Sequence, residues 1–275
     1  MIVKGSPRTH GSSSGFVGSS VMGARHVVEY NLLVFKRVWR GSLTVSFFTP
    51  LFFLTAMGLG LGGLVNRGSG GVGGVPYIDF LAPGLIAATT MQTAAFESMY
   101  PILGKIMWDR TYFAMLATPL AVRDLLAGEV AWLTLRLTMV ASLFWLAMAV
   151  FGVARTPASL LVIPAAALNG LAFATPIMAF TASQRSDTGF GTIARFVITP
   201  LFLLGGAFFP IDKLPLFLQA VAWATPLAHG VALCRGIVLG SLLPGDALAH
   251  VTVLLAFAAA GVVIARPRLA RRLAN

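Results

Sequence analysis

The sequence has few charged residues and almost no cysteine. Only 11% of its 275 residues are Asp, Glu, Lys or Arg, whereas 57% are hydrophobic. A soluble globular domain carries about 25% charged residues, so this composition argues against a soluble protein. The single cysteine, Cys234, excludes an intrachain disulfide. Its apolar surroundings in the sequence predict a buried small side chain rather than a reactive thiol.

Motifs for ATP hydrolysis and metal binding are also missing. The sequence contains no G-x-x-x-x-G-K-[ST] segment, so the chain has no P-loop of its own. None of its four histidines has metal-ligand spacing to Cys or to a carboxylate. We therefore expect this chain to bind no cofactor. Residues 1–21 are polar and rich in Ser and Gly, which predicts a disordered cytoplasmic tail without a cleavable signal peptide.

The chain instead contains six long apolar stretches. A helix needs about 20 apolar residues to cross the hydrocarbon core of a bilayer. We therefore predict an all-α integral membrane protein with six transmembrane helices in a domain that covers residues 42–266. The expected spans are 43–64, 80–102, 126–151, 159–181, 193–209 and 247–265. A short basic tail, 267–275, follows the last span.

Small residues end the first predicted span. The segment from Gly58 to Gly63 matches the G-x-G-x-x-G pattern of dinucleotide-binding folds. That pattern needs a strand before it and a helix after it, and here it lies at the end of a membrane span. We therefore interpret these glycines as positions where helices pack closely.

The basic residues outside the spans lie mostly on one side. If the N-terminus is inside, fifteen Lys and Arg residues are cytoplasmic or at that boundary, and four are outside. Such a bias predicts the orientation of a membrane protein, so we expect both termini in the cytoplasm and the chain in the cytoplasmic membrane. The four outside are Arg67, Arg155, Lys213 and Arg235. Because topology explains the net charge of +11, we expect no nucleic-acid partner.

Two further segments have helical periodicity without spanning length. Residues 22–41 predict an amphipathic helix that lies in the cytoplasmic interface, with Trp39 at the level of the lipid headgroups. Packing against another subunit is the alternative. Its apolar stripe consists of Ala24, Val27, Val28, Val34, Phe35, Val38 and Trp39. Prolines divide the stretch 210–246, which predicts two short helices that dip into the outer leaflet.

Charged residues within the spans are the main chemical candidates. Glu97, Glu129 and Arg136 are costly in hydrocarbon and should face a cavity or one another. Glu129 and Arg136 are seven residues apart on one helix face, about 10 Å along the axis, so Glu97 on the neighbouring helix could bridge them. The three residues either form a structural ion network or line a path for substrate or protons.

The cytoplasmic loop 103–124 is too apolar for a solvated linker. It contains Trp108, Tyr112, Phe113, Met115 and Leu116, and Pro119 ends a probable short helix.

Several blocks, in this order and spacing, resemble the ABC type 2 exporter permeases, in particular those for nodulation lipo-oligosaccharides and for daunorubicin-type drugs. The resemblance covers roughly residues 25–265. The blocks are Phe96–Tyr100, Thr111–Leu120, Asp124, Gly128-Glu129, Pro200–Pro210, Leu214-Pro215, Pro226-Leu227, His229 and Arg235.

The resemblance implies a permease that pairs with a second copy or a paralogue and binds two separate P-loop ATPase subunits, which hold ATP and Mg²⁺. Helix 22–41 would be the connecting helix, and loop 103–124 the coupling helix. The residues expected to dock on the ATPase are Trp108, Arg110, Tyr112, Phe113, Met115 and Leu116. The cargo would be amphipathic, either drug-like or a lipid-linked saccharide.

Aromatic residues are candidates for the path of that cargo. Phe47, Phe48, Phe52 and Phe208 could line it, and by the resemblance Phe208 and Phe209 would help to close an external gate. The alternative for each is a lipid-facing or packing role. A different class of function, a proton-coupled secondary transporter, would use Glu97 or Glu129 as the proton carrier, but the sequence has no inverted repeat to support it.

Overall fold

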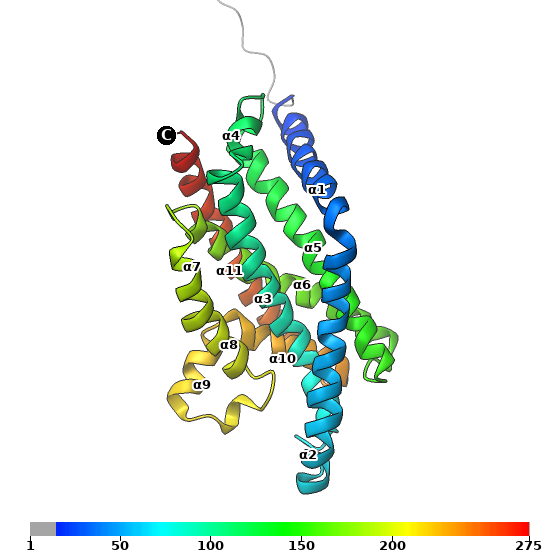
Figure 1. Ribbon diagram of the computed structural model, residues 1–275. Coiled ribbons are helices and arrows are strands. Elements are labelled where there is room, and N and C mark those ends of the chain that lie inside the picture. Colours follow the sequence, from blue (N-terminus) through cyan, green and yellow to red (C-terminus); the bar gives the residue numbers. More distant parts are fainter. Residues whose placement is uncertain (1–14, 275) are drawn as a thin grey trace, which may run out of the picture.

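The computed structural model describes the backbone of residues 15–274 and the side chains of residues 22–274, and in this part of the chain the regular structure is helical. Figure 1 shows most of the helices side by side in one bundle, with the C-terminal end, α4 and the start of α1 at the same end. The α-helices are α1 (Gly15–Phe53), α2 (Gly62–Ser69), α3 (Tyr77–Met107), α4 (Thr111–Leu116), α5 (Val122–Val150), α6 (Val162–Thr181), α7 (Thr188–Ile193), α8 (Thr199–Leu204), α9 (Leu216–Trp223), α10 (Pro226–Leu239) and α11 (Pro244–Ala274). The shorter segments are the π-helical η1 (Leu54–Leu61) and η3 (Ala194–Ile198) and the 3-10 helical η2 (Pro157–Leu161) and η4 (Ile211–Lys213).

The N-terminal helix is longer than the sequence predicts. It begins at Gly15, so residues 15–21 of the predicted disordered tail are helical, and the rest of that tail lies outside the described residues. From there α1, η1 and α2 follow without interruption to Ser69, as one rod along the bundle (Figure 1). No turn parts residues 22–41 from the first span in this structure, and the place of this segment in the membrane interface stays a prediction.

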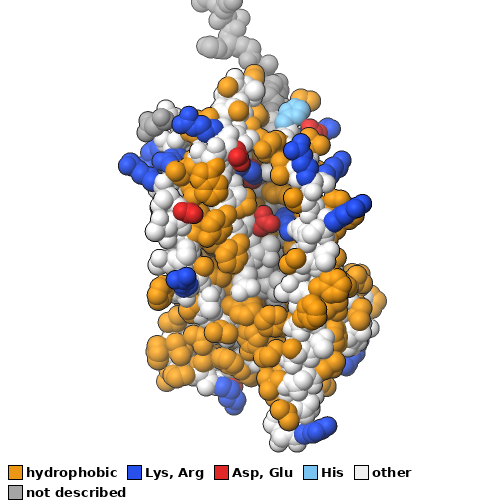
Figure 2. Space-filling model, viewed as in Figure 1, with side chains coloured by type: hydrophobic (Ala, Val, Ile, Leu, Met, Phe, Trp, Pro, Cys, Tyr) orange, Lys and Arg blue, Asp and Glu red, His pale blue; other side chains and the backbone are white. Residues whose placement is uncertain are grey.

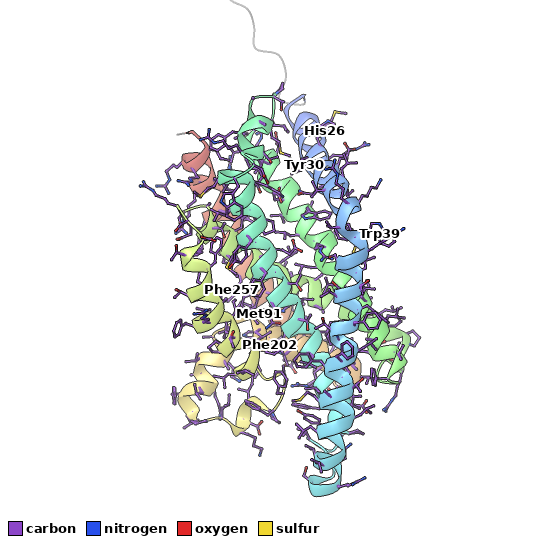
Figure 3. All side chains as sticks on the ribbon, in the orientation of Figure 1. His26, Tyr30, Trp39, Met91, Phe202 and Phe257 are labelled. Carbon is purple, nitrogen blue, oxygen red and sulfur yellow. The ribbon has the colours of Figure 1, made fainter. Side chains whose placement is uncertain are left out.

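The reason lies in what the first turns of α1 bury. Gly23, Val27 and Asn31 repeat every four residues and are buried against α5. A Cβ atom on Gly128 of α5 would lie 2.5 Å from the Cβ of Val27, so only glycine permits this close approach. The predicted apolar stripe is split, since Val27 faces α5 while Trp39 is 44% exposed on the outer side of α1 (Figure 3).

Among the described residues, four helical segments have the length and apolarity of a membrane span. They are Met22–Ser69, Val122–Val150, Pro157–Thr181 and Pro244–Ala274. These contain or match the predicted spans 43–64, 126–151, 159–181 and 247–265. The predicted span 193–209 corresponds to a shorter apolar helix, Thr188–Leu204. The structure thus confirms an all-helical protein with four to five candidate spans, and the count of six stays a prediction.

The predicted span 80–102 is helical but lies in the middle of the bundle rather than at its surface. It falls within α3, which packs against α5, α6 and α10 and buries most of its residues. Polar residues such as Thr90 and Ser98 are fully enclosed there, so α3 is less apolar than a helix that faces lipid. Its neighbours satisfy part of this polarity, because Asn169 of α6 donates to the carbonyl oxygen of Ala87 at 2.8 Å.

The stretch 210–246 is a broken helical pair, as the prolines predict. Helices α9 and α10 meet at an angle of 83°. The guanidinium of Arg235 holds α10 in place, since its carbon lies 3.6 Å from the centre of the Phe80 ring. Arg235 also donates to the carbonyl oxygens of Phe80 at 3.1 Å and Gly206 at 2.8 Å. One partly buried cation therefore joins α10, α3 and the turn after α8.

Candidate functional site

Helix α4 is one short turn-and-a-half at the end of the bundle. Arg110, with φ +52°, reverses the chain after α3, and the helix then covers Thr111–Leu116. The hydroxyl of Thr118 donates to the carbonyl oxygen of Met115 at 2.6 Å, one residue before Pro119 prevents further helix. Trp108 is 61% exposed, whereas Phe113, Met115 and Leu116 are partly buried.

Tyr112 differs from the other residues that we expected to dock on a partner. Its side chain is fully buried under α4 in the isolated chain, and a direct contact of Tyr112 with an ATPase stays a prediction. Burial raises the pKa of the Tyr112 phenol well above its usual value near 10, and the carboxylate of Glu129 raises this pKa further. The Nζ of Lys105 lies 5.8 Å from the centre of the Tyr112 ring. Tyr112 thus anchors α4 to the bundle.

Two cavities flank α4 on opposite sides. The apolar cavity, of about 720 Å³, separates α4 from the first turns of α1, and Figure 3 shows His26 and Tyr30 at this end of α1. Its lining residues are Met22, Gly23, His26, Tyr30, Thr111, Ala114, Met115, Thr118, Pro119 and Leu120. The arginine cavity, of about 810 Å³, separates α4 from α11. Its lining residues are Ile106, Met107, Arg110, Phe113, Ala182, Ser183, Arg185, Arg268, Arg271 and Arg272.

Glu97, Glu129 and Arg136 lie in two separate ion pairs rather than in the bridged trio that the sequence suggested. In the first, the Nζ of Lys105 donates to Glu129 Oε1 at 2.7 Å and to Asn31 Oδ1 at 2.6 Å. The amide of Asn31 donates in turn to Glu129 Oε1 at 3.3 Å and to the carbonyl oxygen of Val27 at 3.1 Å. With 11% of the Lys105 side chain and 2% of the Glu129 side chain exposed, this network is sealed between α1, α3 and α5.

The second pair joins Arg136 of α5 to Glu97 of α3. The Nε of Arg136 donates to Glu97 Oε1 at 3.1 Å, and its Nη2 donates to the hydroxyl of Ser42. The guanidinium carbon also lies 5.1 Å from the centre of the Phe35 ring, in cation–π contact. Glu97 therefore does not bridge Arg136 to Glu129, whose cation is Lys105.

The Glu97–Arg136 pair lines a central cavity of about 720 Å³ between α1, α3 and α5. Figure 2 shows acidic and basic side chains meeting in a hollow of this face, above a band of hydrophobic side chains. Hydroxyl, amide and aromatic groups line the rest. The lining residues are Gly41, Ser42, Val45, Ser46, Thr49, Pro50, Thr89, Gln92, Thr93, Phe96, Glu97, Tyr100, Pro101, Arg136 and Val140. The cavity thus offers hydrogen-bonding groups and apolar surface side by side.

The comparisons with known proteins decide the family. The model of the family described as "ABC-2 type transporter" matches residues 25–239. The chain belongs to this family. A Nodulation protein J of Rhizobium leguminosarum bv. viciae is 35% identical over 243 residues, 88% of this chain and 92% of the relative. A second Nodulation protein J, from Rhizobium leguminosarum bv. trifolii, is 38% identical over 210 residues, which cover 76% of this chain and 79% of the relative. Inner membrane transport permease YadH of Escherichia coli K12 is 25% identical over 210 residues, which cover 72% of this chain and 75% of the relative.

The chain is thus the multi-pass membrane permease subunit of an ABC-type exporter and is not itself an ATPase. The absence of a P-loop from the sequence agrees with this division of labour. Within residues 15–274, no group of three or more His, Cys, Asp and Glu side chains could hold a metal ion.

The aromatic residues of the permease are distributed differently from the prediction. Phe47, Phe48 and Phe52 stack along α1, with ring centres 5.7 Å and 6.2 Å apart, and Phe52 is 70% exposed. Phe208 contacts Phe202 at 5.3 Å and Phe53 at 6.5 Å. Among the described side chains, none of these residues lines the central cavity, and Phe209 is only partly buried beside Phe208.

Sequence reasoning missed the polar partners of the charged residues. Lys105 and Asn31 complete the buried pair, but neither stood out in the sequence as a partner of Glu129. Ser42, which contacts Arg136, follows directly after the predicted helix 22–41. A signal did exist, because Asn31 lies four residues after Val27 on the face that α5 covers.

Proposed function

We propose that the permease moves an amphipathic cargo outward across the cytoplasmic membrane, and that this cargo is a lipid-linked saccharide rather than a drug-like molecule. The observation that carries the proposal is the central cavity. Hydroxyl and amide groups, such as those of Ser46 and Gln92, suit the many hydroxyl groups of a saccharide, and Phe96 and Tyr100 offer rings against which sugar or acyl carbons can pack. The name of the nodulation relatives, which the sequence resemblance links to lipo-oligosaccharide export, supports the same class.

The proposed topology has six spans with both termini in the cytoplasm. The bias of basic residues in the sequence supports it. Figure 2 is consistent with it, since Lys and Arg side chains gather at the α4 end of the bundle and hydrophobic side chains cover much of the other half. In this topology, α3 and the apolar helix Thr188–Leu204 count as spans, and α9 and α10 dip into the outer leaflet.

The proposed partners are a second permease, identical or paralogous, and two P-loop ATPase subunits that bind ATP and Mg²⁺. Helix α4 is the proposed contact with an ATPase. Exposed Trp108 and Arg110 and the open side of Met115 support this, because they present apolar and basic surface at one end of the bundle. A movement of α4 would pass through Tyr112 to the buried pair of Lys105 and Glu129, and from there into α3 and α5.

The cargo is tested with the permease and its ATPase reconstituted together in vesicles. We expect an acylated oligosaccharide to stimulate ATP hydrolysis and to accumulate on the side opposite the ATPase. The free saccharide and the free fatty acid are matched controls, and we expect neither to do so alone. Equal stimulation by a simple cationic drug, with no response to the acylated saccharide, would contradict the proposed cargo class.

The contact is tested with Met115→Asp, which places a charge in the apolar cavity and leaves Leu116, which does not line that cavity, unchanged. We expect the ATPase to be lost from the purified complex while the permease still inserts into the membrane. Ser186→Asp is the control, because this exposed residue lies in the loop after α6 and lines neither cavity beside α4. Normal co-purification of Met115→Asp would exclude α4 as the main contact.

A further inference from the structure

The arginine cavity has a charge that its own walls do not balance. Five arginines line it: Arg110, Arg185, Arg268, Arg271 and Arg272. They come from four places in the chain, namely the start of α4, the loop after α6 and two turns of α11. Arginine stays protonated at every physiological pH, so this cavity of about 810 Å³ brings five positive charges around one space.

The contacts of these arginines leave most of their donors free for another group. Arg268 donates to the carbonyl oxygen of Ala179 at 3.1 Å, and Arg271 to that of Pro267 at 3.4 Å. Within residues 15–274, none of the five forms an ion pair with an acidic side chain, even though Asp109 and Asp187 lie close to two of them in the sequence.

The simplest structural explanation covers only part of the cluster. Basic residues in the last turn of a helix stabilise the negative end of its dipole, and Arg271 and Arg272 occupy that position in α11. Arg110 and Arg185 belong to other elements, and nothing in α11 requires them to line the same space. Like charges held together in this way repel one another unless an anion lies between them.

We infer that the arginine cavity binds a phosphate group, and that this phosphate belongs to an anionic phospholipid. The planar guanidinium fork matches phosphate oxygens in a bidentate geometry. Apart from Ser183, the remaining wall is apolar, with Phe113 as its largest side chain, which suits the glycerol and first acyl carbons of a lipid better than a free ion. Basic pockets between helices at the cytoplasmic face are suited to lipid headgroups. The inference rests on the proposed topology, which places this end of the bundle in the cytoplasm.

A bound headgroup would connect two separate parts of the permease. Arg110 and Phe113 belong to α4, whereas Arg268 and Arg271 belong to α11. The phosphate would therefore tie the proposed ATPase contact to the last helix of the bundle. Anionic lipid in the inner leaflet would then set how firmly α4 is held.

Native mass spectrometry of the permease, extracted from nanodiscs that contain a neutral and an anionic phospholipid, tests the inference. We expect wild type to retain the anionic lipid. We expect R185Q/R271Q to retain at most about one tenth of that amount. K36Q/R37Q removes the same charge from the exposed side of α1, far from the cavity, and should retain lipid as wild type does. An unchanged melting temperature in purely neutral lipid verifies that the variants are folded.

A second experiment distinguishes a phospholipid from free inorganic phosphate as the ligand. Inorganic phosphate, added in excess to permease in neutral lipid, should not raise the melting temperature, whereas anionic phospholipid should. If inorganic phosphate alone stabilised the permease, the cavity would still be a phosphate site, but the claim that the phosphate belongs to a phospholipid would be overturned. Equal lipid retention by both double variants would overturn the site altogether. Loss of the ATPase from R185Q/R271Q with normal lipid retention would assign the arginines to an acidic partner surface instead. None of these outcomes depends on transport, so failure here leaves the proposed export function untouched.

Discussion

The ion pairs Lys105–Glu129 and Glu97–Arg136 have similar chemistry but opposite surroundings. Lys105 and Glu129 are largely enclosed, and Asn31 accepts a hydrogen bond from Lys105 and donates one to Glu129. Glu97 and Arg136 lie on the wall of the central cavity, where 26% of the Glu97 side chain is exposed. The first pair is built like a structural joint, whereas the second leaves one oxygen-bearing side chain within reach of a ligand.

This difference teaches that charge within a span does not by itself indicate a role. Burial decides how much the loss of a partner costs, because an unpaired charge in the interior has no water to replace the lost contact. Access to a cavity decides whether the pair can meet cargo. Because each carboxylate has a cation beside it, neither is placed as a free proton carrier, and the geometry gives no support to proton-coupled transport.

The largest expected effect follows from Glu129→Ala. The change leaves the Lys105 ammonium buried without its anion, and breaking such a pair costs about 3–5 kcal/mol. We expect a strong fall in folded yield and in the melting temperature in detergent. The double variant Lys105→Met/Glu129→Leu removes both charges and should recover most of the loss. If Glu129→Ala melted like wild type, the sealed pair would not be structural.

The isosteric changes Glu97→Gln and Glu129→Gln compare the two pairs directly. We expect Glu97→Gln to reduce cargo-stimulated ATP hydrolysis with a modest loss of stability, about 1.5–3 kcal/mol. We expect the opposite pattern for Glu129→Gln, with a large loss of stability and a small loss of activity per folded molecule.

Transport by Glu97→Gln should still require ATP. Vesicles with an imposed proton gradient and no ATP provide the control, in which we expect neither protein to transport. Transport in wild type driven by the gradient, lost together with proton flux in Glu97→Gln, would favour a secondary transporter.

A smaller effect is expected from Ser42→Ala. The variant removes the hydroxyl that accepts a hydrogen bond from Arg136, which is worth about 1 kcal/mol. Ser46→Ala is a matched control, because Ser46 lines the same cavity one turn further along α1. We expect a lower melting temperature for Ser42→Ala than for Ser46→Ala. Equal values would show that Ser42 does not stabilise the pair of Glu97 and Arg136.

The smallest expected effect is the contribution of Tyr112, which anchors α4 to the bundle, to the pH dependence of stability. Because burial and Glu129 raise the pKa of the Tyr112 phenol in the folded protein, folding favours its protonated form. The resulting stability is complete below the unfolded pKa near 10 and is lost as the pH rises above it. We expect the melting temperature of wild type to fall more than that of Tyr112→Phe between about pH 8 and about pH 10.5. Parallel curves would mean that Tyr112 does not titrate in the unfolding transition.

Local sequence features predicted much of this architecture. Apolar length located most of the spans, and the prolines of 210–246 located the bend between α9 and α10. Glu97, Glu129 and Arg136 stood out because charge is rare in hydrocarbon. Their partners did not, since the pairing of Lys105 with Asn31 depends on α1 continuing straight past α5. That continuation is a tertiary fact, set by Gly128 and Val27 in contact.

The uninterrupted helix from Met22 to Ser69 gives the permease a lever. At 1.5 Å per residue its 48 residues extend about 72 Å, so a tilt of about 5° displaces the far end by roughly 6 Å. The π-helical turn at Leu54–Leu61 is the soft section of that lever, since its wider hydrogen-bond register gives way more easily than an α-helix. A push beside α4 would therefore reach the opposite rim as rotation about this section.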